Sequence, residues 1–371
     1  MARTLDPRSG STALLDVGKV EAMYREGRYE EAIAVGESLL PNDYPSAGCG
    51  LLCYCVGMSY LQLALPQRGK ELLAEARAHF EAAGDRAKIV DCMCGESSVA
   101  LLEQRADAVP LAEKALAACR ALREIPDALE MRILRTLGAA HVAAGEWADA
   151  ISVLNDARRQ AGSLFDMRQQ AKLFTNLAVA HEELGQPDQA IGYCVRAVAL
   201  LETLGDQISL ARAENNLGWL LVGCGDLARA RVHLIRSLDL SIEAGTLSGR
   251  GSVLHSLSAL CFAEGELAQA AAFANEALAT SEQCNEGRTA AEARIMKVRI
   301  AERQGDHVEA DRQFELGLQL LDGLGMTARA VVVRIRFAAM LESRGELERA
   351  YGQLKAAYSI RQAGPNQRSA T

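Results

Sequence analysis

Apolar residues recur along this chain at the spacing of amphipathic helices. One such run, EMRILRTLGAAHVAA, spans residues 130–144 and is followed by a glycine, a polar residue and a second apolar run. A glycine at that place suits the left-handed conformation that ends a helix, because it has no Cβ to clash. The polar residue suits the positively polarised N-terminus of the next helix. The pattern therefore predicts a helix, a tight turn and a second helix.

This helix–turn–helix pattern repeats along the chain. Its six clearest copies follow one another at a period of 40 residues and begin at Gly145, Gly185, Gly225, Gly265, Gly305 and Gly345. Looser copies surround Gly27, Pro66 and Arg105, which makes nine helix pairs. Small residues recur at Ala150, Ala190, Ala230, Ala270, Ala310 and Ala350, and again at Ala157, Ala197, Ser237, Ala277, Gly317 and Ala357, where helices should approach closely. Because one pair cannot bury both its faces, we expect the pairs to stack into a solenoid.

The two ends of the chain differ from this array. Residues 1–12 and 364–371 are polar and rich in Gly, Pro and Ser, so we expect them to be disordered around a solenoid that spans 13–363. The last pair, GELERAYGQLKAAYSIRQ, is not followed by the polar capping helix that a solenoid normally needs. Three explanations stay open: a homodimer through the C-terminal end, a last helix polar enough by itself, or a sensory segment separated from a longer protein.

Composition narrows the class of protein. Lys and Arg number 40 against 48 Asp and Glu, and this net charge of −8 argues against a nucleic-acid binder. Only 8 prolines and 5% aromatic residues make a β-sandwich or barrel improbable. The sequence shows no membrane-spanning run and no signal peptide, and its ten cysteines lack a compact disulfide frame. A cytoplasmic location is the expectation.

The repeated residues resemble a known family. The slots Leu137-Gly138, Leu177-Ala178 and Leu217-Gly218, the Gly-Asp/Glu turn and the small residues of the second helix are similar to tetratricopeptide repeats. The period resembles the long variant of kinesin light chain, of cell-polarity adaptors, and of bacterial peptide-pheromone receptors and Rap-type regulators. The resemblance implies an all-α, right-handed superhelical solenoid of about nine helix pairs. HEAT repeats have a similar period but do not favour this Gly and Ala spacing. The fold hosts many partners, so the resemblance says little about function.

In such a solenoid the first helices line a concave groove, and residues 40 apart form rows across it. One row consists of Thr136, Asn176, Asn216, Ser256, Met296 and Arg336. In the resembled families an Asn at this slot hydrogen-bonds the backbone of a bound extended peptide. The resemblance therefore implies peptide contact for Asn176 and Asn216. The alternative is that each amide caps or braces a neighbouring helix.

A second row holds three cations, Arg132, Lys172 and Arg212. Neighbouring helices lie roughly 8 to 10 Å apart, so these charges should attract a carboxylate of an acidic partner. The alternative is a solvated face. Four more residues should lie near these rows: Arg135, Asn215, Trp219 and His255. Trp219 is expected either to project into the groove as an apolar anchor or to fill the core.

A further basic region lies in the first helices of the last two pairs, at Arg288, Arg294, Lys297, Arg299, Arg303, Arg329, Arg334 and Arg336. It suits either an acidic partner or an output domain outside this chain.

Chemistry-bearing motifs are weak in this sequence. It has no G-x-S-x-G, no P-loop and no H-E-x-x-H. Cys49, Cys53 and Cys55, with Cys92 and Cys94, lack the C-x₂-C pairs of structural zinc, so we interpret them as small buried hydrophobes. His141 and His181 are assigned to packing. We expect no cofactor, no metal and no enzymatic activity.

These observations favour a non-enzymatic scaffold that binds a peptide or protein segment in its concave groove, in bacterial regulation or signalling. The alternative is the sensory segment of a larger signalling enzyme such as a diguanylate cyclase, because the end of the chain weakly resembles arrays that precede such domains.

Overall fold

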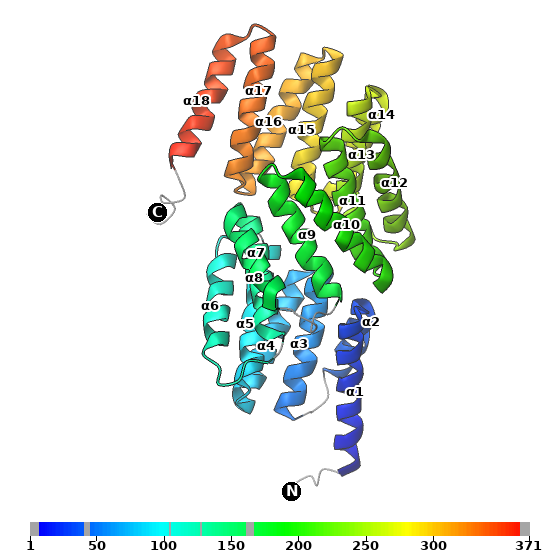
Figure 1. The fold of residues 1–371 in the computed structure, drawn as a ribbon, viewed down its shortest axis with the longest axis vertical. Helices are drawn as coiled ribbons and strands as arrows, with labels where there is room; N and C mark the ends of the chain where they lie inside the picture. Colours follow the sequence, from blue (N-terminus) through cyan, green and yellow to red (C-terminus); the bar gives the residue numbers. More distant parts are fainter. Residues whose placement is uncertain (1–6, 41–44, 104, 127, 161–166, 364–371) are drawn as a thin grey trace. The chain divides into compact units, whose positions relative to one another are not determined.

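The computed structural model describes residues 7–40, 45–103, 105–126, 128–160 and 167–363. Every regular element among them is an α-helix, and none of these residues lies in a strand. The chain divides into two compact units, Met1–Leu200 and Leu201–Thr371. The prediction of an all-α fold of repeated helix pairs is confirmed for the described residues (Figure 1).

Unit 1 contains the first five helix pairs. Their helices are α1 (Pro7–Glu26), α2 (Tyr29–Leu39), α3 (Ser46–Gln62), α4 (Pro66–Ala83), α5 (Arg86–Leu102), α6 (Ala108–Arg120), α7 (Leu129–Ala144), α8 (Trp147–Gln160), α9 (Met167–Glu183) and α10 (Pro187–Leu204), whose last turn begins unit 2. Helix α1 begins at Pro7, so residues 7–12 are helical rather than disordered as expected. Proline fits the first turn of a helix because its missing N–H is not needed there. Residues 1–6 and 364–371 lie outside the described residues.

Unit 2 contains the last four pairs. Their helices are α11 (Gln207–Gly223), α12 (Leu227–Glu243), α13 (Arg250–Glu264), α14 (Leu267–Gln283), α15 (Gly287–Gln304), α16 (His307–Gly323), α17 (Thr327–Ser343) and α18 (Leu347–Ala363). In both units the turns fall at the expected glycines. Gly145, for example, has φ 78° and ends α7 in the left-handed conformation. The polar residue after the glycine caps the next helix where it is Asp: Asp226 accepts a hydrogen bond from the Arg229 amide, whereas the longer Glu266 makes no such bond.

The small slots are where the helices of a pair meet. Ala150 and Ala230 are fully buried, as are their counterparts at Ala190, Ala270 and Ala310. Gly138 also lies where two helices approach closely, because a Cβ there would lie 2.4 Å from the side chain of Leu154 on the facing helix. The Gly and Ala spacing predicted from the sequence is therefore a packing requirement.

Within each unit, successive odd-numbered helices contact one another. Contacts of this kind join α3 to α5 and α5 to α7 in unit 1, and α11 to α13 and α13 to α15 in unit 2. We call the side that they present the inner face of the unit, and we treat the two inner faces separately.

The cysteines behave as small hydrophobes in most places. All ten are free thiols, and seven of them are buried. Burial raises the pKa of Cys53, Cys55 and Cys92 to about 12, so these thiols stay protonated at neutral pH. In the described part of the chain, none of the helices is long and apolar enough to cross a bilayer.

Candidate peptide-binding faces

The inner face of unit 1 carries a polar cluster that is satisfied by its own residues. Arg132 on α7 donates a hydrogen bond to Asp91 on α5 at 2.8 Å, and the Asp91 side chain is only 6% exposed. Tyr54 on α3 also hydrogen-bonds Asp91. Burial raises the pKa of Tyr54 and of Tyr24 on α1, and the nearby Asp91 carboxylate raises both further. Arg132 thus balances the charge of a buried carboxylate.

Both cations that unit 1 contributes to the predicted row have partners within the chain. Arg132 is engaged by Asp91, and Lys172 on α9 donates a hydrogen bond to Gln62 on α3. One helical turn before Lys172, Arg168 donates to the carbonyl oxygen of Glu26 at 3.0 Å. The 40-residue register did not reveal these partners, because the first three repeats are spaced irregularly and Asp91 lies 41 residues before Arg132.

Two other expected site residues on this face make fewer contacts. Arg135 on α7 has an Nε atom that is buried without a hydrogen-bond partner among the described residues, and burial lowers the pKa of its guanidinium. Asn176 on α9 is half-buried, and its amide forms no hydrogen bond to any described residue. Both side chains keep unused polar groups on the inner face of unit 1.

The inner face of unit 2 has a different character. Trp219 on α11 stacks on His255 on α13, with ring centroids 5.5 Å apart and an interplanar angle of 30°. Both rings are half-buried. Burial lowers the pKa of His255 to about 4, so the imidazole is neutral near pH 7. Its Nδ1 atom is buried and finds no hydrogen-bond partner in the described structure.

Arg299 lies beside this aromatic stack, and Arg336 lies near Arg299. Arg299 on α15 lies over the Phe262 ring, 4.6 Å from the centroid, and is close enough to His255 to lower its pKa. Burial lowers the pKa of Arg299 itself, and the positive charge of Arg336 on α17 lowers it further. Among the described residues neither guanidinium is paired with a carboxylate. By contrast, the nearby Glu292 is paired with Arg329 through two hydrogen bonds of 2.6 and 2.5 Å.

The remaining candidates of unit 2 lie on α11. Arg212 is exposed and makes no ion pair with a described residue. Asn216 is half-buried with its amide unused by the described residues, whereas Asn215 is buried and donates a weak hydrogen bond of 3.5 Å to Ser252. Asn215 therefore contacts the neighbouring helix, and Asn216 is the amide that stays available.

The structure thus brings together Trp219 and His255 and places Arg299 beside them, with Arg336 near Arg299. The sequence placed Arg299 only in a broad basic region, and it placed Arg336 both there and in the row that holds Asn216. Phe262 was missed. Its position beside Arg299 depends on side-chain direction, which a repeat period does not encode.

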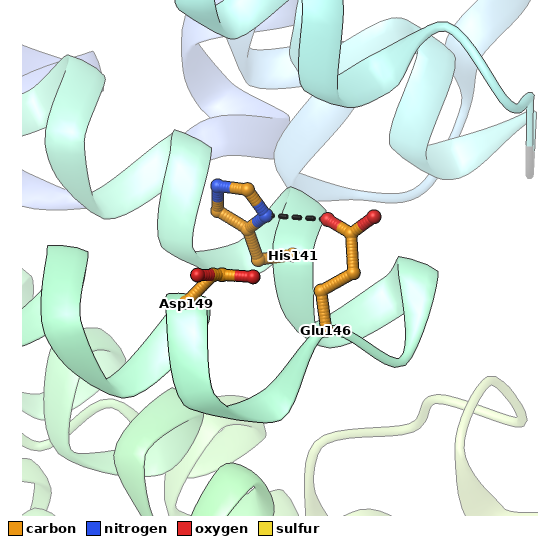
Figure 2. A group of neighbouring side chains, drawn as sticks. All are labelled: His141, Glu146 and Asp149. Carbon is orange, nitrogen blue, oxygen red and sulfur yellow. Dashed lines mark hydrogen bonds and ion pairs between the residues drawn. The ribbon is translucent and has the colours of Figure 1, made fainter.

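Among the residues that the structure describes, two groups of side chains have the composition of a metal site. Figure 2 shows one of them, in which His141 Nδ1 lies 2.6 Å from a carboxylate oxygen of Glu146 and Asp149 lies beside the ring. The equivalent His181 makes the same contact with the amide of Gln186, also at 2.6 Å. A neutral amide at the equivalent place indicates that the histidine braces the turn in both pairs.

The second group consists of Cys261, Glu264 and Glu266. Glu264 is ion-paired with Arg231, and burial raises the pKa of the Cys261 thiol. The raised pKa keeps the Cys261 thiol protonated, which disfavours a thiolate ligand. The ion pair with Arg231 makes the Glu264 carboxylate less available to a metal cation.

Comparison with known proteins agrees with this architecture. A tetratricopeptide repeat family model matches residues 169–243. The structure of a Rap protein complexed with competence and sporulation factor is 12% identical, with a TM-score of 0.64 over 86% of this chain and 99% of that one. Aspartyl phosphate phosphatase F from Bacillus subtilis is 11% identical, with a TM-score of 0.61 over 98% and 96%. The apo quorum sensor NprR from B. thuringiensis is 14% identical, with a TM-score of 0.61 over 86% and 89%.

Among curated proteins, none matches the sequence. The family-model match identifies tetratricopeptide repeats at residues 169–243, and the repeated helix pairs of the described residues have a tetratricopeptide-like fold. At these identities the similarity to solved structures concerns the fold alone.

Proposed function

We propose that this protein is a non-enzymatic scaffold that binds an extended peptide, or an extended segment of a protein, on its inner faces within a cytosolic bacterial regulatory pathway. The fold supports this proposal, because it is similar to that of the Rap conjugation gene regulator of plasmid pLS20 in complex with the Phr* peptide (15% identical, TM-score 0.51, covering 85% of this chain and 95% of that one). The proposal assigns no catalytic residue.

The observation that carries the proposal is the set of unsatisfied groups on the inner face of unit 2. The positive charge of Arg336 is close enough to disfavour the charge of Arg299, and no described carboxylate is paired with either guanidinium. An anion placed between them would relieve that repulsion and accept charge-assisted hydrogen bonds. The site therefore favours a peptide with an acidic side chain or a terminal carboxylate.

The aromatic stack supplies the second part of the proposed site. Trp219 and His255 offer a half-buried planar surface on which an apolar side chain of the ligand can pack. The unpartnered Nδ1 of the neutral His255 ring is suited to accept a hydrogen bond from a peptide N–H. Asn216 lies three residues before Trp219 and therefore on the same side of α11, where its amide can pair with a peptide group.

The inner face of unit 1 contributes Asn176 and Arg135 to the proposal, because their polar groups are unused. Arg132 and Lys172 are not proposed as ligand contacts, since Asp91 and Gln62 already engage them.

A display library of linear peptides selected against the intact protein tests the proposal. Selected peptides should share an acidic position next to an apolar one. Their affinity should fall at least about tenfold in Arg299→Glu, because a charged hydrogen bond worth about 1.5 to 3 kcal/mol is lost. Binding to the wild type should also weaken as salt rises, because the attraction is screened.

Two matched controls accompany these measurements. Arg288→Glu makes the same charge change on α15 at an exposed position near the start of the helix and should leave binding unchanged. Trp219→Ala should weaken peptide binding, because it removes one ring of the aromatic stack. Trp147→Ala removes the other tryptophan of the sequence and should leave peptide affinity unchanged. Peptides that bind all four variants with wild-type affinity would show that this face is not the site.

A further inference from the structure

Lys297 on α15 occupies a slot that the other clear repeats fill with a buried apolar side chain. The residues at the same 40-residue register are Leu137, Leu177, Leu217, Leu257 and Phe337, and each is at most 4% exposed. Lys297 is half-buried, and its ammonium forms no ion pair and no hydrogen bond with a described residue. Burial lowers the pKa of this amine. A lysine in this slot therefore has a desolvation cost that leucine does not have.

A cavity of about 170 Å³ lies beside Lys297. Its apolar lining consists of Ala271 on α14 and of Ile300 and Ala301 on α15. Its polar lining consists of Asn275 on α14, Lys297 and Gln304 on α15, and Glu309 on α16. We call this cavity the α15 pocket. It includes residues of two even-numbered helices, so it is distinct from the inner face of unit 2. Sites for drug-sized ligands measure about 300 to 1,000 Å³, so the α15 pocket suits a smaller molecule.

The α15 pocket is open because two of its slots hold the smallest side chain found at their register. The slot of Ala301 holds larger residues in the other clear repeats, namely His141, His181, Leu221, Cys261 and Leu341. The slot of Ala271 also holds larger residues, namely Ile151, Ile191, Arg231, Asp311 and Tyr351. The small side chains therefore leave space beside the one lysine.

The neighbouring junctions between helix pairs close the equivalent place with an ion pair. Arg231 on α12 pairs with Glu264 on α13. At the same slots two repeats later, Asp311 on α16 pairs with Arg344 on α17 at 2.7 Å. Between these two junctions the slots hold Ala271 and Gln304, which cannot form an ion pair. The slots of Lys297, Ala271, Ala301 and Gln304 thus differ together from their counterparts.

We propose that the α15 pocket binds a small monocarboxylate, with its carboxylate paired to Lys297 and its short apolar chain packed against Ile300 and Ala301. An ammonium donates strong charge-assisted hydrogen bonds to a carboxylate, and these would compensate the desolvation of Lys297. The amides of Asn275 and Gln304 are further donors in the lining.

Glu309 shapes the charge that the pocket accepts. Its carboxylate already accepts hydrogen bonds from Arg312 at 2.7 and 2.9 Å and from Gln313 at 2.9 Å, so it is engaged by α16 itself. Its negative charge in the lining disfavours a ligand with two negative charges. A monoanion therefore fits the pocket better than a dianion such as phosphate.

A ligand-observed NMR titration of the full chain with butyrate tests the proposal, with butyramide and inorganic phosphate as comparison probes. Butyrate should bind, and the other two should bind at least about tenfold more weakly. Butyramide has the same shape but lacks the charge, and phosphate brings a second charge close to Glu309. An affinity for butyramide or phosphate equal to that for butyrate would overturn the assignment to a monocarboxylate. A wild type that does not bind butyrate would overturn the proposal as a whole.

Three variants locate the binding. Lys297→Met removes the ammonium but keeps an unbranched side chain, and it should weaken butyrate binding at least about tenfold. Ala301→Leu keeps Lys297 and fills the cavity with the residue that Leu221 and Leu341 provide in other repeats, so it should weaken binding as strongly. Lys355→Met is the matched control, because it removes an exposed ammonium of α18, and it should leave the affinity unchanged.

Thermal melts by circular dichroism show whether each variant is folded. Either pocket variant, if folded and still binding butyrate with wild-type affinity, would contradict the proposal. A loss of binding in Lys355→Met equal to that in Lys297→Met would also contradict it, because the attraction would then come from the overall charge and not from the pocket.

Discussion

Replacing Asp91 by Asn should destabilise unit 1, and the size of the loss follows from the cluster around it. The substitution keeps the shape of the side chain but leaves the Arg132 guanidinium without a countercharge. Breaking a fully buried ion pair costs about 3 to 5 kcal/mol. The Asp91 side chain is 6% exposed but that of Arg132 is 33% exposed, so water compensates part of the loss. We therefore expect a decrease in the free energy of unfolding of about 2 kcal/mol.

Urea unfolding followed by circular dichroism measures this decrease. Because stability in a repeat array is local, the transition of unit 1 should shift while its slope stays the same. Glu81→Gln is the matched control: it breaks an ion pair with Arg77 whose members are 55% and 36% exposed, and it should cost less than about 0.5 kcal/mol.

The double variant Asp91→Asn with Arg132→Met completes a mutant cycle. It should be more stable than Asp91→Asn alone, because it removes the uncompensated charge as well, with a coupling of about 1 to 3 kcal/mol. A coupling near zero would refute the reasoning. Arg132 would then be available to a ligand, as the sequence suggested.

Three further predictions rest on other parts of the structure. Gly218→Ala should destabilise unit 2 by about 1 to 3 kcal/mol, because the new Cβ would lie 2.6 Å from the Leu234 side chain. Gly192→Ala changes an open position inside α10 and should stabilise the protein by about 0.5 to 1 kcal/mol. Thermal melts of the two variants measure both effects. The pKa of His255 falls from 6.5 to about 4 on folding, so the contribution of the neutral ring to stability is complete above pH 6.5 and is lost as pH falls toward 4. In His255→Gln the free energy of unfolding in urea should therefore decrease less between pH 6.5 and pH 4 than in the wild type. An equal decrease in both proteins would contradict the lowered pKa of His255. In the native protein Cys224 should react first with a thiol-specific disulfide reagent while Cys53, Cys55 and Cys92 stay protected, and metal analysis should find no stoichiometric zinc.

The repeat pattern predicts much of the fold because backbone geometry limits what each slot accepts. The turn at Gly145 needs a left-handed residue, and Ala150 and Gly138 lie where helices leave no room for larger side chains. These requirements recur every 40 residues and are therefore visible in one sequence.

The site was less predictable because partner choice depends on side-chain direction and on exact register. Trp219 and His255 were expected near the same rows, and they do stack. Arg132 was expected to face a ligand, yet a shift of one residue in the spacing of the early repeats gives it Asp91 instead. The period places a residue on a face but does not determine its partner.

The division between fully buried small slots and variable inner-face positions has an evolutionary consequence. Helix pairing depends on residues such as Ala230 and Ala270, whereas the slot that holds Trp219 on α11 holds Ala259 on α13 and Arg299 on α15. Tandem duplication of one 40-residue gene segment would therefore add a pair that already stacks on its neighbours. Mutation could then change the inner-face side chains of the new copy, and with them the ligand it recognises, without compromising the packing that both copies share.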